Sequence, residues 1–431
     1  MIDKLPINWE WIPLGEYVEN HDAARVPVSS KEREKREGKY PYYGASGVID
    51  QIDGYTHQGE YLLLGEDGAN LLARSKPIAF LAKGKFWVNN HAHVLKCRGE
   101  APNAYLAYYL NRIDLAPYVT GTAQPKLGQA KMNKIPIPVA PLDQQERIVA
   151  ELEKQFSRLD EAVATLKRVK ANLKRYKAAV LKAAVEGKFA SIDPSGWTRT
   201  NLGAVLTNIE AGKSFKCEER LPNIREIGVV KVSAVTWGTY DEEESKTCLD
   251  PDRIETRYFV KPGDFLFSRA NTIQLVGRCV IAQKVTRKIM LSDKILRFRF
   301  SDMVLPQWVL YWLRSDIGRK EIERLSTGNQ ESMRNIGQDR IRQIAFALPN
   351  LKEQHAIVAE VERRLSVIEE LEAAVEANLT RADRLRQAIL SQAFSGRLLG
   401  QEAKYIPEIM PALSIAAETQ ARYGEDNRAG R

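Results

Sequence analysis

The stretch Ile135-Pro-Ile-Pro-Val-Ala-Pro-Leu-Asp-Gln-Gln-Glu-Arg-Ile-Val-Ala-Glu-Leu-Glu153 returns as Ile344-Ala-Phe-Ala-Leu-Pro-Asn-Leu-Lys-Glu-Gln-His-Ala-Ile-Val-Ala-Glu-Val-Glu362. The offset of 209 residues is constant, and the register continues without a gap to residues 179–187 and 388–396. Self-similarity over such a length is typical of a duplicated structural unit. The chain is therefore predicted to contain two copies of one unit, each a globular segment followed by a long helix.

Both long helices have a predicted start. Asp143 is followed by Glu146, and Asn350 is followed by Glu353. This is the spacing of a capping box, in which the first side chain accepts a hydrogen bond from a free backbone N–H and the second reaches back. We therefore expect each helix to begin at its own capping box.

Glycine ends both helices, and one apolar stripe runs along each of them. Gly187 and Gly396 can adopt the left-handed conformation that closes a helix. Between start and end, apolar residues recur at spacings of three and four, which indicates one buried seam per helix. The predicted seam residues are Leu152, Phe156, Leu159, Val163, Leu166, Val361, Leu365 and Ile368.

The length of the helices predicts how they pack. A helix of about 44 residues spans roughly 66 Å, which is too long to be buried against one small domain. We expect one antiparallel two-helix coiled coil, and the alternative is that each helix packs on a separate chain. The predicted fold class is α+β, with two mixed α/β domains held apart by this coiled coil and related by an internal pseudo-twofold repeat. The predicted divisions are residues 1–141, 142–190, 191–349, 350–398 and a tail, 399–431.

Short strands dominate the globular segments, and only residues 104–112 and 307–324 look helical. The strand signals are apolar or β-branched runs between turn residues. They are Tyr61-Leu-Leu-Leu64, Phe86-Trp-Val88, Val94-Leu-Lys-Cys97, Gly228-Val-Val-Lys-Val232, Phe265-Leu-Phe267, Cys279-Val-Ile281 and residues 295–300.

Composition excludes several classes of protein. The chain has 431 residues and a net charge of +9, and a single hydrophobic core stops growing at roughly 250–300 residues. No apolar run approaches the roughly 18–20 residues of a membrane helix, and the first residues lack the apolar core of a signal peptide. We therefore expect a chain of at least two domains in the cytoplasm.

Neither a metal site nor an active site is predicted. Cys97, Cys217, Cys248 and Cys279 match no zinc or disulfide spacing, so we expect them to be reduced and structural. His91-Ala-His93 has no acidic or cysteine partner at ligand spacing. The run Ala211-Gly-Lys-Ser214 lacks the first glycine of a phosphate-binding loop, because Thr207 stands in that position.

The positive charge suits DNA recognition. Most of the excess lies in the globular segments, where Lys and Arg can neutralise phosphates while Arg, Asn and Gln can pair with base edges. On composition alone, a merely solvated basic surface is the alternative.

The order of motifs resembles the DNA specificity subunit of type I restriction-modification enzymes, over residues 1 to about 398. The same kinds of motif appear in both halves, before and at the start of each long helix. They are Tyr42-Tyr-Gly-Ala-Ser-Gly-Val-Ile-Asp50, Gly59-Glu-Tyr-Leu-Leu-Leu-Gly65, Gly121-Thr-Ala-Gln-Pro-Lys126, Pro138-Val-Ala-Pro-Leu-Asp-Gln-Gln-Glu-Arg-Ile-Val149, Lys261-Pro-Gly-Asp-Phe-Leu-Phe267, Thr327-Gly-Asn-Gln330 and Leu351-Lys-Glu-Gln-His-Ala-Ile-Val358.

The resemblance implies a non-catalytic subunit with two target recognition domains, each reading one half of an asymmetric, interrupted DNA sequence. The spacer helices would set the gap between the halves, and their outer faces would bind two modification subunits. Those partners bring S-adenosylmethionine, and restriction subunits add ATP- and Mg-dependent chemistry. This chain itself is expected to bind no cofactor and no metal.

Residues for DNA contact are chosen as polar or aromatic side chains in strands and turns of the two domains. In the first domain they are Lys39, Tyr42, Tyr43, Ser46, Gln124 and Lys126. In the second they are Lys213, Ser214, Lys231, Ser233, Arg269, Asn271, Gln330 and Arg334.

Two other functions stay open from the residues alone. A stand-alone DNA-binding regulator would need no methyltransferase partner, and a coiled-coil adaptor would have no DNA specificity. Exposed apolar residues expected on the outer helix faces, including Ala178, Ala179 and Leu181, argue against the regulator because they favour a bound partner.

Overall fold

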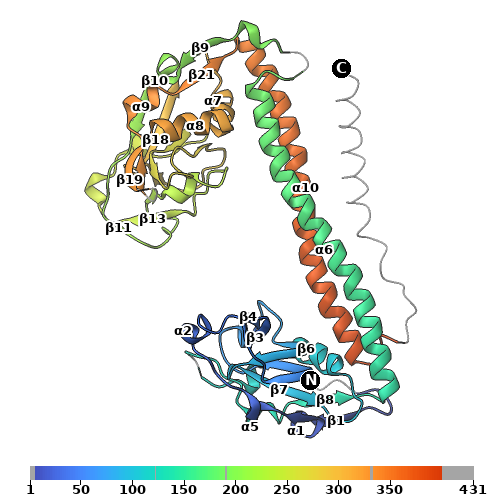
Figure 1. Cartoon of the computed structure of the whole chain (residues 1–431). Helices are drawn as coiled ribbons and strands as arrows, with labels where there is room; N and C mark the ends of the chain where they lie inside the picture. Colours follow the sequence, from blue (N-terminus) through green and yellow to red (C-terminus); the bar gives the residue numbers. More distant parts are fainter. Residues whose placement is uncertain (1–4, 122, 190–191, 331–332, 400–431) are drawn as a thin grey trace. The chain divides into compact units, whose positions relative to one another are not determined.

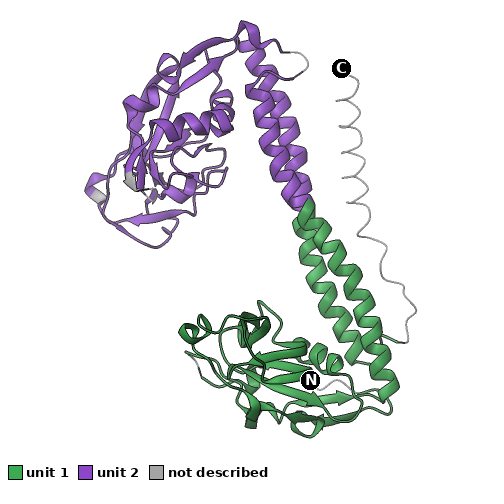
Figure 2. Ribbon diagram, viewed as in Figure 1, with its two compact units in different colours: residues 1–168, 374–431 green, residues 169–373 purple. Residues whose placement is uncertain are grey.

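The computed structural model describes residues 5–121, 123–189, 192–330 and 333–399 (Figure 1). The chain divides into two compact units (Figure 2). Unit 1 comprises Met1–Arg168 and Ala374–Arg431, and unit 2 comprises Val169–Ala373. Both long helices cross this division, so each unit combines one globular part with a portion of each helix (Figure 2).

Unit 1 is built on a six-stranded sheet in the order β2-β7-β5-β6-β3-β4. Its central strand is β5, where Leu62, Leu63 and Leu64 are fully buried because both faces of the sheet are covered. The elements of this part are β1 (Glu10–Pro13), α1 (Leu14–Tyr17), β2 (Val18–Asn20), η1 (Asp22–Ala24), α2 (Ser30–Arg33), β3 (Tyr40–Gly44), β4 (Gly47–Ile52), β5 (His57–Gly65), α3 (Asn70–Ala73), β6 (Ala79–Val88), β7 (Ala92–Cys97), α4 (Asn103–Arg112), η2 (Ala116–Tyr118), α5 (Gln129–Met132) and β8 (Pro136–Val139).

Unit 2 contains a four-stranded sheet in the order β10-β18-β14-β16, with β14 at the centre. A second four-stranded sheet, β11-β13-β12-β17, and a three-stranded sheet, β15-β20-β19, complete it. The elements are η3 (Pro194–Gly196), β9 (Thr198–Asn201), η4 (Leu202–Ala204), β10 (Leu206–Ala211), β11 (Cys217–Glu218), β12 (Gly228–Val230), η5 (Val232–Val235), β13 (Ser245–Cys248), η6 (Pro251–Arg253), η7 (Thr256–Tyr258), β14 (Phe265–Ser268), β15 (Ala270–Asn271), β16 (Cys279–Ile281), β17 (Ile289–Met290), β18 (Ile295–Phe300), α7 (Pro306–Arg314), α8 (Asp316–Leu325), β19 (Thr327–Gln330), β20 (Met333–Asn335), α9 (Gln338–Arg342) and β21 (Ala345–Leu348).

The duplication is visible in the topology. The order β2-β7-β5-β6 in unit 1 corresponds to β10-β18-β14-β16 in unit 2, and the two-stranded pair β1-β8 corresponds to β9-β21. Two glutamines 209 residues apart make the same contact. Gln145 donates to the Ala140 carbonyl over 2.8 Å, and Gln354 donates to the Pro349 carbonyl over 2.8 Å.

The long helices are α6 (Leu142–Val185) and α10 (Leu351–Phe394), each of 44 residues. The capping box is confirmed at α10, where Asn350 and Glu353 exchange hydrogen bonds of 3.0 and 3.1 Å. It is wrong at α6, because Asp143 already lies inside the first turn and the position equivalent to Asn350 is Pro141. Both terminal glycines have the predicted left-handed backbone.

Within each unit, the two helices run past each other in opposite directions. In unit 1, the first part of α6 meets the last part of α10, where Arg386 pairs with Asp160 and covers the ring of Phe156 at 4.5 Å. In unit 2, Lys177 of α6 lies 3.9 Å from Glu369 of α10. The coiled coil as a whole stays a prediction.

Most predicted seam residues are buried. The buried ones are Leu152, Phe156, Leu159, Leu166, Val361 and Ile368, whereas Val163 and Leu365 are half-buried. On the outer faces, Ala178 and Ala179 are exposed as expected, but Leu181 is buried. Across the described residues, every helix is too short or too polar to traverse a lipid bilayer.

Candidate nucleic-acid interface

Three turns of unit 1 meet where the central strand β5 ends. The Leu127 amide donates to the Glu66 carbonyl over 2.7 Å, and the Gly68 amide donates to the Pro125 carbonyl over 2.9 Å. The β3–β4 turn comes so close that a Cβ at Gly65 would lie 2.8 Å from the Ala45 carbonyl oxygen. We call this surface the unit 1 turn cluster and define it as residues 45–46, 66–68 and 123–126.

The turn cluster brings together three of the predicted DNA-contact residues. Ser46 lies in the β3–β4 turn and is half-buried, while Gln124 and Lys126 are exposed. Lys39 is separate, because it precedes β3 whereas Ser46 follows that strand. The Lys39 ammonium lies 5.5 Å from the ring centre of Tyr40.

The two tyrosines are packing residues, which corrects the sequence prediction. Tyr42 is 1% exposed, and its hydroxyl accepts a hydrogen bond from the Val28 amide over 2.9 Å. Tyr43 is half-buried and stacks on Phe80 with its edge contact to Phe86. Burial raises the pKa of Tyr43. Neither ring is presented as a platform for a base.

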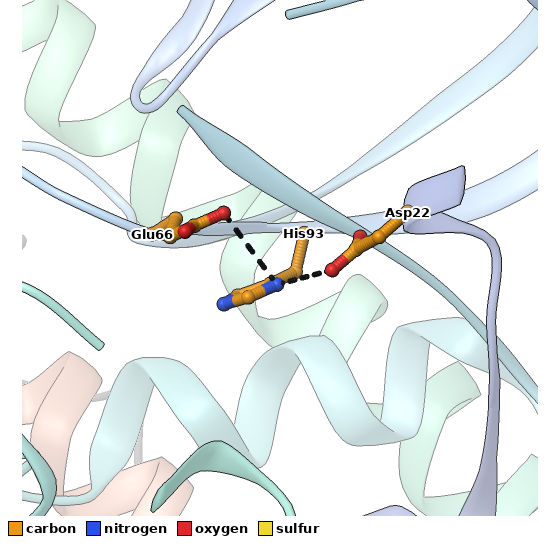
Figure 3. Close-up of side chains that lie close together, drawn as sticks. All are labelled: Asp22, Glu66 and His93. Atoms are coloured by element: carbon orange, nitrogen blue, oxygen red, sulfur yellow. Dashed lines mark hydrogen bonds and ion pairs between the residues drawn. The ribbon is translucent and has the colours of Figure 1, made fainter. Parts of the chain in front are cut away.

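A charge network adjoins the turn cluster, and three of its side chains, Asp22, Glu66 and His93, lie close together (Figure 3). Asp22 lies 2.6 Å from Nδ1 of His93, and Arg25 contacts Glu66 at 2.6 Å. Lys126 reaches the same Glu66 at 3.1 Å. Burial acts to raise the pKa of Asp22, but the hydrogen bond and charge of His93 outweigh it and hold that pKa below its usual value.

Sequence reasoning found no acidic partner at ligand spacing near His91 or His93, and the structure supplies partners from distant parts of the sequence. Asp67 lies 2.8 Å from His91, and Asp22 reaches His93 from 71 positions away in the sequence. Local spacing carries no signal for contacts between residues so far apart. Asp22 reaches His93 because η1 packs beside β7, and Asp67 reaches His91 because β5 ends next to β7.

Ligand atoms of Asp22, Glu66 and His93 lie within 4.8 Å of one another, which could suit a metal ion. The surroundings do not fit one. Two cationic side chains already pair with the carboxylates. Nε2 of His93 lies 2.8 Å from the Leu127 carbonyl oxygen. Because a carbonyl oxygen only accepts, this nitrogen carries a proton and has no lone pair for a metal. The cluster is an ion-pair network that fixes the turn at residues 123–126.

We expect metal to leave this network unchanged. Adding Zn²⁺ or a chelator to the purified protein should shift Tm by less than about 1 °C, because no ligand atom is available without breaking an ion pair. Differential scanning calorimetry measures the shift, and an Asp22→Asn variant is the control. A rise of several degrees with Zn²⁺ that this variant abolishes would establish a metal site.

In unit 2, lysines gather around a hollow of about 260 Å³. It is formed where β12 and β13 lie side by side and where the chain bridges from Lys213 to Ser292. A Cβ at Gly212 would lie 2.0 Å from the Leu291 carbonyl oxygen, so only glycine permits this approach. The hollow is lined by Lys213, Ser214, Phe215, Val229, Val230, Lys231, Val232, Lys246, Ser292, Asp293 and Lys294. We call it the lysine pocket.

Carboxylates hold the pocket lysines in place. Glu219 contacts Lys231 at 3.3 Å and Lys246 at 3.4 Å, and these contacts lower the pKa of Glu219. Glu255 contacts Lys213 at 2.5 Å, and this hydrogen bond raises the pKa of Lys213. Exposed ion pairs of this kind contribute little stability.

The lysine pocket contains three of the predicted residues and two that sequence reasoning missed. Lys213, Ser214 and Lys231, which the sequence suggests as DNA contacts, line it together with Lys246 and Lys294. Ser233 lies in η5, and its hydroxyl donates to Glu244 over 2.5 Å. The strand pairing of β12 with β13 that brings Lys246 to Lys231 is a long-range contact, so local sequence gave no sign of it.

The three-stranded sheet of unit 2 adjoins the pocket. The Arg269 amide donates to the Lys294 carbonyl over 2.9 Å, and the Arg269 side chain donates to Asn335 over 3.3 Å. Asn271 pairs with Arg334 across β15 and β20. Gln330 belongs to β19, and its side chain lies outside the described part of the structure.

Arg334 makes hydrogen bonds that stabilise the β19–β20 hairpin, and its role as a DNA contact stays a prediction. Its guanidinium donates to the Gly328 and Ser326 carbonyls over 2.9 Å each and to the Ser326 hydroxyl over 3.2 Å. These three bonds use three of the five N–H donors of the guanidinium.

The candidate surfaces occupy equivalent positions in the two units. In unit 1, the segment after β5 bridges to the turn at Lys126, through the pair Asp67 and Lys126. In unit 2, the segment after β14 is β15, which pairs with β20. Because β5 and β14 are the corresponding central strands, the same end of the repeated fold carries both surfaces, with different side chains on each.

Comparison with known proteins accounts for this duplicated architecture. Residues 6–175 match the family described as the type I restriction modification DNA specificity domain. A type I restriction enzyme specificity subunit of Haemophilus influenzae is 29% identical over 390 residues, covering 89% of this chain and 95% of the relative. The chain is similar over most of its length to type I specificity subunits. The EcoKI specificity subunit of Escherichia coli is 29% identical over 300 residues, covering 67% of this chain and 63% of the relative.

Solved structures from type I restriction-modification systems share the fold. A chain from a study of complex assembly in a type I system has a TM-score of 0.67 at 20% identity, covering 92% of this chain and 100% of that one. The HsdS subunit of Thermoanaerobacter tengcongensis has a TM-score of 0.50 at 20% identity, covering 92% and 98%. The predicted α+β class is confirmed, and the relatives agree with the predicted resemblance to specificity subunits, which are the non-catalytic subunits of type I systems.

Proposed function

We propose that this chain is a specificity subunit that reads one half of an interrupted, asymmetric DNA target with each unit. The observation that carries the proposal is the pair of candidate surfaces at equivalent positions of the repeat. Equivalent positions would let both units approach DNA in the same way, and different side chains would make the two half-sites different. The comparisons favour this function over a stand-alone regulator or an adaptor.

The two kinds of side chain have separate roles. Lys213, Lys231 and Lys246 contact phosphates, because lysine provides a point charge without a base-specific pattern. Gln124 and Arg269 read base edges, because their planar groups can make paired hydrogen bonds with adenine and guanine respectively. The charge network beside the unit 1 turn cluster holds Gln124 in position through the backbone of Lys126 and Leu127.

The long helices set the gap between the half-sites. Each has 44 residues, and a helix of that length spans roughly 66 Å, which is about two turns of B-DNA at roughly 34 Å per turn. A continuous helix resists changes of length better than a loop does. The helix length therefore selects the number of base pairs between the two half-sites.

Partner subunits perform the chemistry. Two modification subunits bind the outer faces of α6 and α10, where Ala178 and Ala179 are exposed, and they transfer methyl groups from S-adenosylmethionine to adenine. Restriction subunits add cleavage that depends on ATP and Mg²⁺. The double-stranded DNA target places this work in the cytoplasm.

The proposal is tested by co-expressing the chain with its modification subunit and mapping methylated adenines on a plasmid. Methylation at one interrupted motif, absent without this chain, is the expected result. A complex that assembles but methylates without an interrupted motif would contradict recognition by two units. The chain would then act only as an adaptor.

Single substitutions assign each half-site to a unit. Gln124→Ala is expected to relax one half of the motif and Arg269→Ala the other, each by roughly 10- to 100-fold in discrimination, because a paired base contact is worth about 1–3 kcal/mol. Each variant serves as the control for the other in the same methylation map. Equal weakening on all DNA would instead assign the altered residue to the phosphate backbone.

A further inference from the structure

Two cysteines that are distant in the sequence face each other in unit 2. Cys217 and Cys248 are separated by 31 positions, yet β11 pairs with β13 in an antiparallel register that places them directly opposite. Opposite residues of such a pair point to the same face of the sheet. Both side chains pack beside the buried residues Val229, Tyr258 and Met290.

The hydrogen bonds around the pair show which kind of site it is. The Leu249 amide donates to the Lys216 carbonyl over 2.8 Å, so the backbone hydrogen bond joins the residues next to the two cysteines and not the cysteines themselves. The Cys248 amide points the other way, to the Ile227 carbonyl at 2.9 Å. Cys217 and Cys248 therefore form a non-hydrogen-bonded pair, in which the Cα atoms lie about 4.5 Å apart. Disulfides span Cα separations of about 4.4–6.8 Å.

Accessibility separates this pair from the other cysteines. Cys217 and Cys248 are half-buried thiols, so a small oxidant can reach them at the sheet edge. Cys97 and Cys279 are 4% and 2% exposed. Burial raises the pKa of both thiols, to about 12 for Cys97, and it also raises the pKa of Cys217. Access of the oxidant therefore distinguishes the two sets, which makes Cys97 and Cys279 internal controls.

We propose that Cys217 and Cys248 are an oxidation site at which a peroxide forms a reversible disulfide between β11 and β13. One thiolate attacks an oxygen of the peroxide, and the O–O bond breaks. That sulfur becomes a sulfenic acid, and the other oxygen takes up a proton and leaves as the first water. The second sulfur attacks the sulfenic sulfur, the S–O bond breaks, and the second water leaves as the S–S bond forms. The two thiols lose two electrons and two protons, and one hydrogen peroxide becomes two waters.

The disulfide restrains one wall of the lysine pocket. β11 is an edge strand of two residues. Lys213, Ser214 and Phe215 of the pocket wall precede it, and Glu219 follows it. A covalent link to β13 holds Glu219 over Lys231 and Lys246, the lysines that it already contacts. Oxidation therefore weakens DNA binding by unit 2, a consequence that rests on the proposed function.

The chemical part is tested on the purified, reduced full-length chain. Hydrogen peroxide is added, remaining thiols are alkylated, and tryptic peptides are analysed by mass spectrometry. We expect a peptide pair cross-linked between Cys217 and Cys248, removable by dithiothreitol, while Cys97 and Cys279 are alkylated. A Cys97→Ser/Cys279→Ser variant should form the same cross-link, and Cys217→Ser should not. Separate oxidation of the two cysteines without a cross-link would overturn the proposal.

The functional part compares how tightly the reduced and the oxidised protein bind a DNA duplex. The duplex carries the motif that the methylation map identifies. We expect oxidation to weaken binding about tenfold, with recovery in dithiothreitol and no response in Cys217→Ser. Specific binding of the reduced protein that oxidation leaves unchanged would overturn the link to DNA. Reduced protein that shows no specific binding would instead contradict the proposed function itself.

Discussion

Replacing Arg297 with methionine is expected to destabilise unit 2 by about 3–5 kcal/mol, because the change leaves a buried carboxylate without its main partner. The Arg297 and Asp264 side chains are 4% and 3% exposed, and their charged groups lie 2.9 Å apart. The same guanidinium pairs with Glu210 and donates to the Phe259 and Arg257 carbonyls. Methionine fills similar space but replaces none of these bonds.

The neighbouring arginine provides a matched control. Arg299 contacts the same two carboxylates at 3.1 Å each, but its side chain is 43% exposed. Arg299→Met should therefore cost less than about 1 kcal/mol. Urea unfolding followed by circular dichroism gives both values, and hydrogen exchange should place the Arg297→Met loss in β10, β14 and β18. Equal losses for the two variants would show that burial does not strengthen the Arg297 pairs.

The stability difference should also depend on pH. Burial acts to raise the pKa of Glu210, but the hydrogen bonds from Arg297 and Arg299 outweigh it and hold that pKa below its usual value. A carboxyl with a lowered pKa adds stability at pH values above its unfolded pKa and loses it as the pH falls. The gap between wild type and Arg297→Met is therefore expected to narrow in acid.

Neutralising two lysines of the pocket should weaken DNA binding by roughly 10- to 100-fold at physiological salt. Each phosphate contact adds about 0.9 to the slope of log affinity against log salt, so Lys213→Gln/Lys231→Gln should lower that slope by about 1.8. Glutamine keeps most of the side-chain length and removes only the charge. Fluorescence anisotropy on a labelled duplex, repeated from about 50 to 200 mM salt, measures both quantities.

A second double variant separates pocket geometry from net charge. Lys261 and Lys284 are exposed and lie near the start of β14 and the end of β16, away from the end of β14 that adjoins the pocket. Lys261→Gln/Lys284→Gln removes the same two charges. It should lower the slope by clearly less than the pocket variant does. Identical slopes would mean that unit 2 attracts DNA only by its overall charge.

The fold was largely predictable because its strongest signals are long or duplicated. Apolar spacing over 44 residues and the terminal glycines leave few alternatives to α6 and α10. The central strands are apolar runs buried on both faces. The start of α6 was misjudged because an acidic pair three residues apart also occurs inside a helix, and Pro141 begins this helix where Asn350 begins the other.

The candidate site was predictable only where it depends on local sequence. Turn residues such as Gln124 follow glycines that can be recognised, whereas Lys246 joins Lys231 through strand register that no local pattern encodes. Tyr42 was misassigned because an aromatic residue beside a glycine-rich turn looks the same whether it points into the core or out of it. The opposed cysteines escaped notice for the same reason as Lys246.

The sheet beside the lysine pocket ends on very short strands, β11 and β17, each of two residues. A bridge from Phe259 to Met290 also covers β17. Unpaired edges are the places where sheets from different molecules join and aggregate. Here little backbone is left for a strand of a second molecule to pair with, so the sheet is protected from edge-to-edge aggregation. This protection matters when the protein is concentrated at low salt, the condition in which its electrostatic contacts with DNA are strongest.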